Sequence, residues 1–119
     1  MNGSNLIVGK SMDFAVRIVN LYKYLTKEKS EYILSKQLLR SGTSIGANVS
    51  EAVRAQSTAD FIAKMYIALK ESGETEYWLK LLEKTDYLSN FQAESILKDC
   101  EELIKILVSI IKTTKQKNS

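Results

Sequence analysis

The sequence predicts an all-α protein that folds as an antiparallel up-down four-helix bundle. Apolar residues recur with the 3.6-residue period of a helix nearly throughout the chain, and no segment alternates with the two-residue period of a strand. The chain has no proline, and short polar connections separate four amphipathic segments. Four such segments are typical of a bundle in which successive helices run in opposite directions.

We expect a single domain over residues 1–119, because this length suits one compact core. The first helix is predicted at residues 11–27, where the apolar side chains share one face. The second is predicted at residues 36–55 and follows Ser35, a residue type that favours the N-cap position. The polar tail at residues 113–119 is expected to fray.

Capping boxes predict where the third and fourth helices begin. Ser57 and Asp60 have the spacing in which a serine oxygen accepts a hydrogen bond from the backbone N–H three residues ahead. This box predicts a third helix at residues 58–85. A second box at Ser89 predicts a fourth helix at residues 90–115.

The composition excludes several kinds of chemistry. Without histidine, imidazole catalysis, histidine-containing zinc sites and the histidine ligands of di-iron bundles are ruled out. The single cysteine, Cys100, cannot form an internal disulfide and is compatible with a reducing cytoplasm. The longest apolar run, residues 106–111, is too short to cross a membrane, and no leader segment is visible. We therefore expect a cytoplasmic, non-enzymatic protein without cofactor, metal or membrane contact.

Charge is distributed unevenly along the chain. Basic residues predominate in residues 1–54 and acidic residues in residues 71–102, and the net charge is +3. Lys98, Lys105 and Lys112 recur every seven residues opposite the apolar face of the fourth helix, which predicts a row about 20 Å long. Further candidate phosphate-binding residues are Arg17, Lys36 and Arg54. Because no aromatic residues interleave with the row, binding would be directed to the phosphate backbone. Pairing with neighbouring glutamates would instead make the row an ordinary surface.

The third helix has more apolar surface than one core requires. Ile67, Trp78 and Leu81 project away from its inward face, and this strip would favour aggregation unless a partner covered it. We therefore expect the strip to form an oligomer interface. The alternative is that the third helix is central and buried on several sides within one chain.

One carboxylate, Glu76, falls within the inward arc of the same helix. A buried carboxylate has to be paired, hydrogen-bonded or protonated, and Arg40 and Asn48 are possible partners. We expect a polar cluster that fixes helix register, with a polar contact at a subunit interface as the alternative.

Small residues are concentrated in residues 41–48 of the second helix. Gly42 and Gly46 each cost about 1 kcal/mol relative to alanine in a helix, so a compensating interaction is expected. Small side chains allow two backbones to approach, which predicts close packing of another helix here. The segment lacks the Gly-Lys-Ser/Thr ending and the preceding strand of a phosphate-binding loop.

The run from Gln37 to Glu51, with its Ser-Ile-Gly-Ala-Asn sequence, resembles the 23S rRNA intervening-sequence protein family, also called the four-helix bundle protein family. The resemblance covers residues 10–112. The chain departs from the family at Gly46, where proline is common, and at Ala52, where glycine is frequent. The polar positions that match the family's motif are Arg40, Ser44, Asn48, Glu51, Ser72 and Glu76.

The resemblance implies a short bacterial protein that assembles as a homopentamer and has no catalytic residue. Members are often encoded within an insert in a large-subunit ribosomal RNA gene. A related branch looks like the accessory proteins of diversity-generating retroelements, which bind nucleic acid and a reverse transcriptase. The leading hypothesis is a homo-oligomeric scaffold that binds RNA or DNA. The alternative is an adaptor that docks a partner enzyme without contacting nucleic acid.

Overall fold

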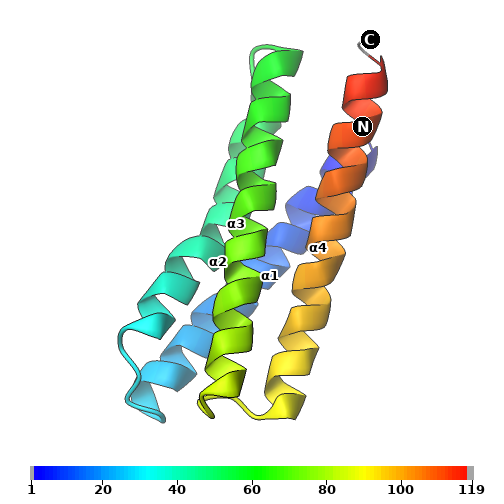
Figure 1. The fold of residues 1–119 in the computed structure, drawn as a ribbon. Coiled ribbons are helices and arrows are strands. Elements are labelled where there is room, and N and C mark those ends of the chain that lie inside the picture. Colours follow the sequence, from blue (N-terminus) through cyan, green and yellow to red (C-terminus); the bar gives the residue numbers. More distant parts are fainter. Residues whose placement is uncertain (1, 118–119) are drawn as a thin grey trace.

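The computed structural model describes residues 2–117, with side chains from Asn5 onward, and forms four helices. They are α1 (Asn2–Lys27), α2 (Leu34–Ala52), α3 (Thr58–Lys84) and α4 (Asn90–Lys117) (Figure 1). No strand occurs in residues 2–117, which confirms the predicted all-α four-helix fold. The predicted tail continues α4 as far as Lys117, and its last two residues lie outside the described part of the chain.

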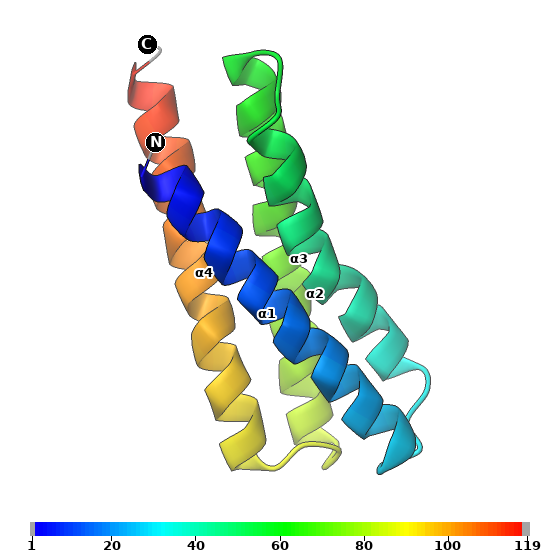
Figure 2. The same ribbon diagram turned by 180° about the vertical axis from the view of Figure 1, so that it is seen from behind.

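Successive helices run in opposite directions, and the four pack around the bundle in chain order (Figure 1). Each helix contacts the next and α1 also contacts α4, whereas neither diagonal pair is in contact within residues 2–117. Figure 2 shows that α1 is tilted and crosses from the end of α4 to the start of α2. The bundle measures 48 × 21 × 18 Å, so functional groups have to lie on helix faces or between helix ends.

The start of α1 differs most from the sequence prediction. The helix begins well before residue 11 because Ile7 is fully buried and extends the apolar face that Phe14 and Ile18 continue. All other predicted boundaries lie within three residues of those observed.

The predicted N-cap role of Ser35 is wrong, because the carboxylate of Glu31 performs this function. It accepts hydrogen bonds from the backbone N–H groups of Ile33 (3.2 Å), Leu34 (3.0 Å) and Ser35 (2.6 Å). Ser35 lies inside α2, buried, and its hydroxyl donates to the Glu31 carbonyl oxygen at 2.8 Å. Burial raises the pKa of the Glu31 carboxyl, whereas the hydrogen bonds from the three N–H groups lower it. The hydrogen bonds together have the larger effect, so the pKa of Glu31 lies below its ordinary value.

Both predicted serine caps are present, but among the described residues only the box at Ser89 is reciprocal. The Ser57 hydroxyl accepts a hydrogen bond from the Asp60 N–H at 3.0 Å where α3 begins. At the start of α4, the Gln92 N–H donates to the Ser89 hydroxyl at 3.1 Å, and the Ser89 N–H donates to the Gln92 amide oxygen at 2.9 Å. These side chains satisfy backbone donors that have no partner within the helix.

The glycines of α2 allow α1 to approach closely, as predicted. A Cβ atom on Gly42 would lie 2.7 Å from Cγ1 and 2.9 Å from Cδ1 of Ile18, which is fully buried. A Cβ atom on Gly46 would lie 3.3 Å from the carbonyl oxygen of Ser11. The packing of α1 against bare backbone therefore compensates for the low helix propensity of these glycines.

Replacing Gly42 by Ala is expected to lower the free energy of unfolding. The clash with Ile18 corresponds to overpacking, which costs about 1–3 kcal/mol and exceeds the gain in helix propensity of about 1 kcal/mol. In an Ile18→Ala background, the added methyl group would instead occupy vacated space. Urea denaturation of the two single variants and the double variant should therefore give strongly non-additive changes, and additive changes would contradict the proposed contact.

Replacing Glu31 by Gln should destabilise the protein by about 1–2 kcal/mol at pH 7, as loss of a helix cap does. Because the pKa of Glu31 is lower in the folded state, its contribution is present above the ordinary glutamate pKa and is lost as the pH falls through the folded-state pKa. The difference in unfolding free energy between wild type and variant should therefore shrink in acid. Glu28→Gln, at an exposed neighbouring position, is the control; a difference that persisted at low pH would argue against this role.

Candidate nucleic-acid interface

The predicted lysine row lies on the exposed outer face of α4. Lys98, Lys105 and Lys112 are all exposed and extend over about 21 Å of helix. None forms an ion pair with a described residue, and Glu102, a possible partner of Lys98, pairs instead with Lys10 of α1 at 3.2 Å. The three ammonium groups are therefore available to an external anion.

The other predicted basic residues do not join this row. Arg17 reaches across to α4, where it donates to Asp99 at 2.7 Å and to the Ser95 hydroxyl at 3.0 Å. Lys36 lies on α2 and Arg54 follows the end of α2, which is diagonally opposite α4. Both are exposed, but they face a different side of the bundle. Within one chain, only the α4 lysines form a continuous row.

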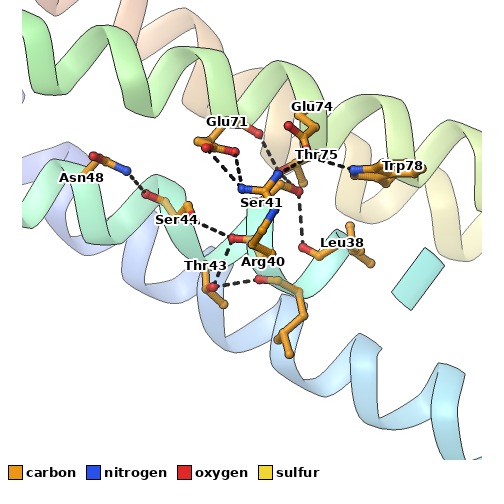
Figure 3. Close-up of polar contacts among 11 residues, drawn as sticks. Leu38, Arg40, Ser41, Thr43, Ser44, Asn48, Glu71, Glu74, Thr75 and Trp78 are labelled. Atoms are coloured by element: carbon orange, nitrogen blue, oxygen red, sulfur yellow. Dashed lines mark hydrogen bonds and ion pairs between the residues drawn. The ribbon is translucent and has the colours of Figure 1, made fainter. Parts of the chain in front are cut away.

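The family-motif residue Arg40 stabilises the contact between α2 and α3 (Figure 3). Its guanidinium pairs with Glu71 at 3.3 Å and with Glu74. The indole N–H of Trp78 also donates to Glu74, at 3.1 Å. The hydrogen bonds from Trp78 and Arg40 lower the pKa of the Glu74 carboxyl. Beneath this cluster, the buried hydroxyls of Ser41 and Thr75 are hydrogen-bonded at 2.9 Å.

Three further motif residues also have structural roles. The Ser44 hydroxyl donates to the carbonyl oxygen of Arg40 at 2.6 Å, and the Asn48 amide donates to that of Ser44 at 2.8 Å (Figure 3). Glu51 pairs with Lys64 of α3 at 3.5 Å. These contacts satisfy polar groups along α2 and link it to α3, and none forms a catalytic arrangement.

Glu76 does not occupy the buried position predicted for it. Its side chain is partly exposed and lies 4.0 Å from Lys80, whereas Arg40 pairs with Glu71 and Glu74. The prediction failed because Glu76 lies at the edge of the inward face of α3, near α4. The pKa of Cys100 is raised to about 12, first by burial of the thiol and second by the negative charge of Glu76.

Ser72 and Cys100 connect α3 to α4 inside the core. Ser72 is buried, and its hydroxyl donates to the carbonyl oxygen of Leu69 at 2.7 Å. The thiol of Cys100 lies 3.3 Å from the carbonyl oxygen of Ser72. With its raised pKa, Cys100 is a neutral packing residue rather than a nucleophile.

The predicted apolar strip on α3 is only partly exposed. Ile67 is 39% exposed, but Trp78 and Leu81 are half-buried, and Trp78 packs against the core. The expectation that all three project into solvent is therefore wrong. Trp78 lies at the edge of the α2–α3 contact, where Glu74 accepts its indole N–H.

A different apolar face, which was not predicted from the sequence, lies on α1. Met12 is 64% exposed and Val16 is 53% exposed, with Val8 on the same side of the helix. Beside them, small residues of α2 line a groove of about 310 Å³. The four-residue spacing of Val8, Met12 and Val16 was the available signal.

Neither a metal cluster nor a membrane-spanning helix is found among the described residues. No group of three or more acidic or cysteine residues in the described chain could hold a metal ion. No helix among the described residues is long and apolar enough to span a bilayer.

Comparison with known proteins places the chain in a family. A crystal structure from Bacteroides thetaiotaomicron VPI-5482, described as a protein with unknown function from the S23 ribosomal protein family, is 60% identical and superposes with a TM-score of 0.92. The match covers 92% of this chain and 98% of that one. No curated protein shows a significant match. The family model for the 23S rRNA-intervening sequence protein matches residues 4–109, and the chain belongs to that family.

Proposed function

We propose that the protein is a non-enzymatic, homo-oligomeric scaffold that binds RNA or DNA through its phosphate backbone. The observation that carries this proposal is the row of Lys98, Lys105 and Lys112, which is exposed and unpaired among the described residues. Unpaired cations at regular spacing can replace the counterions of a polyphosphate chain. A related branch of the family, which looks like the accessory proteins of diversity-generating retroelements, would have the same class of partner.

A single row of three lysines would bind weakly, and assembly would multiply it. In a ring of identical copies, every protomer contributes one row, so several weak contacts act on the same nucleic acid. We take the ring to be a pentamer, as the family resemblance implies, and the single cysteine is compatible with the cytoplasm.

The apolar face of α1 supports self-association. Val8, Met12 and Val16 form an uncharged surface, and Gly9 beside them has no neighbouring atom within 4 Å that would exclude a Cβ atom. A glycine at such a position costs helix propensity without any packing benefit inside the chain. Contact with a second copy would supply that benefit.

The outer face of α3 carries an exposed side chain and an open glycine at the same spacing as the α1 face. Gly73 also has no neighbour within 4 Å, and it lies seven residues after the exposed Tyr66. Val16 likewise lies seven residues after Gly9, and α1 and α3 run in the same direction. In a ring with its axis along the bundle, Tyr66 of one copy can cover Gly9 of the next while Val16 covers Gly73. Such head-to-tail contacts close into rings.

The lysine row is tested by replacing Lys98, Lys105 and Lys112 together by Gln. Binding of a fluorescent single-stranded RNA, followed by anisotropy from low to physiological salt, should weaken. In a plot of the logarithm of the association constant against the logarithm of the salt concentration, the slope is negative. Its magnitude should decrease by about 0.7 for each phosphate contact removed. The control variant replaces three other exposed lysines by Gln, so it loses the same total charge. These are Lys27, Lys29 and Lys84, which lie near the end of the bundle opposite Lys112. Equal losses in both variants would contradict a specific row; no binding at low salt would favour a protein adaptor.

The α1 interface is tested by Met12→Glu, because a charge in an apolar contact would be desolvated without a partner. Light scattering should give an oligomer for the wild type and a mass near 13.5 kDa for the variant, with unchanged helicity. Leu6→Glu introduces the same charge at an exposed apolar residue on another side of α1 and should remain oligomeric. An intact Met12→Glu oligomer would place the interface elsewhere, with the Ile67, Trp78 and Leu81 strip as the next candidate.

A further inference from the structure

Phe91 has the most exposed large apolar side chain among the described residues, at 84%. It lies in the first turn of α4 and takes no part in the hydrophobic core. Together with α1, it borders a pocket of about 370 Å³. This volume falls within the range of about 300–1,000 Å³ that is usual for small-molecule sites.

The walls of this pocket combine an aromatic surface with polar groups. Tyr24 lines it from α1 and Phe91 from α4, so two aromatic side chains are available to a flat ligand. The amides of Asn20 and Gln92 also line it. Asn20 forms no side-chain hydrogen bond with a described residue, and Gln92 uses only its oxygen, which accepts from the Ser89 N–H.

Arg17 forms a fixed, positively charged part of the same pocket. Its guanidinium is held by Asp99 at 2.7 Å and by the Ser95 hydroxyl at 3.0 Å. Because both partners lie on α4, these contacts hold α1 against α4 beside the pocket. Aromatic faces, free amide groups and a guanidinium are the features that recognise unpaired nucleobases.

The exposed ring of Phe91 is in helical register with the lysine row. Phe91 precedes Lys98 by seven residues, the same interval that separates Lys98, Lys105 and Lys112. Seven residues of helix advance about 10.5 Å and rotate the face by only about 20°. The exposed aromatic ring is therefore the first member of a line that continues with three cations.

We propose that this pocket binds one unpaired nucleobase of a single-stranded nucleic acid. The base stacks on Phe91 beside Tyr24, the amides of Asn20 and Gln92 bind its edge, and Lys98 contacts a neighbouring phosphate. The inference rests on the proposed nucleic-acid function and restricts the partner to single strands. In an intact duplex, neighbouring bases cover both faces of each base, so no face is free to stack on Phe91. The protein should consequently prefer single strands to duplexes.

The test compares single-stranded RNA with a duplex of the same length and salt concentration by anisotropy. Loss of one base–aromatic stacking contact lowers affinity by about 5- to 150-fold, so Phe91→Ala should weaken single-strand binding by that factor and leave duplex binding nearly unchanged. Phe91→Tyr should restore binding. Tyr32→Ala, which removes another exposed aromatic ring far along the chain from α4, should have no effect.

A second measurement detects the stacking directly. Phe91→Trp places an indole in the pocket, and its fluorescence should be quenched by single-stranded RNA, whereas the wild type, whose only tryptophan is Trp78, should change little. Equal affinity for single strands and duplexes, or full single-strand affinity of Phe91→Ala while the triple lysine variant is weakened, would overturn the inference but leave the proposed function standing. No binding of any nucleic acid would overturn both.

Discussion

The packing of Ile18 against the bare backbone of Gly42 determines how α1 lies in the bundle. Because no Cβ atom intervenes, α1 follows α2 closely at this point and crosses the bundle at a tilt (Figure 2). Its first half then lies near the end of α4, while its second half diverges from the start of α4. The pocket beside Phe91 occupies this divergence, and the groove beside Met12 follows the close α1–α2 contact. Both candidate surfaces thus accompany the close approach of α1 to the two glycines of α2, Gly42 and Gly46.

The contact between α2 and α3 is stabilised differently, by polar side chains. Buried hydroxyls of Ser41 and Thr75 pair in the interior, while Arg40 binds two carboxylates at the surface. The interior pair satisfies groups whose burial would otherwise be unfavourable, and the surface pairs set the alignment of the two helices. The residues that resemble the family's motif therefore specify how helices pack. For this reason the motif identifies the fold but assigns no chemistry.

Local sequence signals predicted those features that depend on one helix alone. Helical period, the serine caps of α3 and α4 and the lysine spacing on α4 are all properties of a single segment, and the structure contains each of them. Features set by the position of a helix in the bundle were harder to predict. Apolar residues lie on several sides of α3. Helical projection alone therefore predicted too much solvent exposure for Trp78 and too much burial for Glu76. Glu31 was missed because it caps α2 from the preceding connection, and Phe91 because its pocket exists only where two helices diverge.

The two proposed surfaces are compatible because they lie on different sides of one bundle. The apolar stripe of α1 lies beside α2, and its complement on α3 is diagonally opposite α1. The lysines and Phe91 project from the exposed outer face of α4, and the α3 residue Tyr66 reaches that helix at Lys115, which is not a member of the row. Assembly through α1 and α3 would therefore leave one lysine row and one base pocket open on every protomer. A weak site repeated around a ring acquires affinity through multivalency, so a small protein that assembled in this way would hold a long nucleic acid.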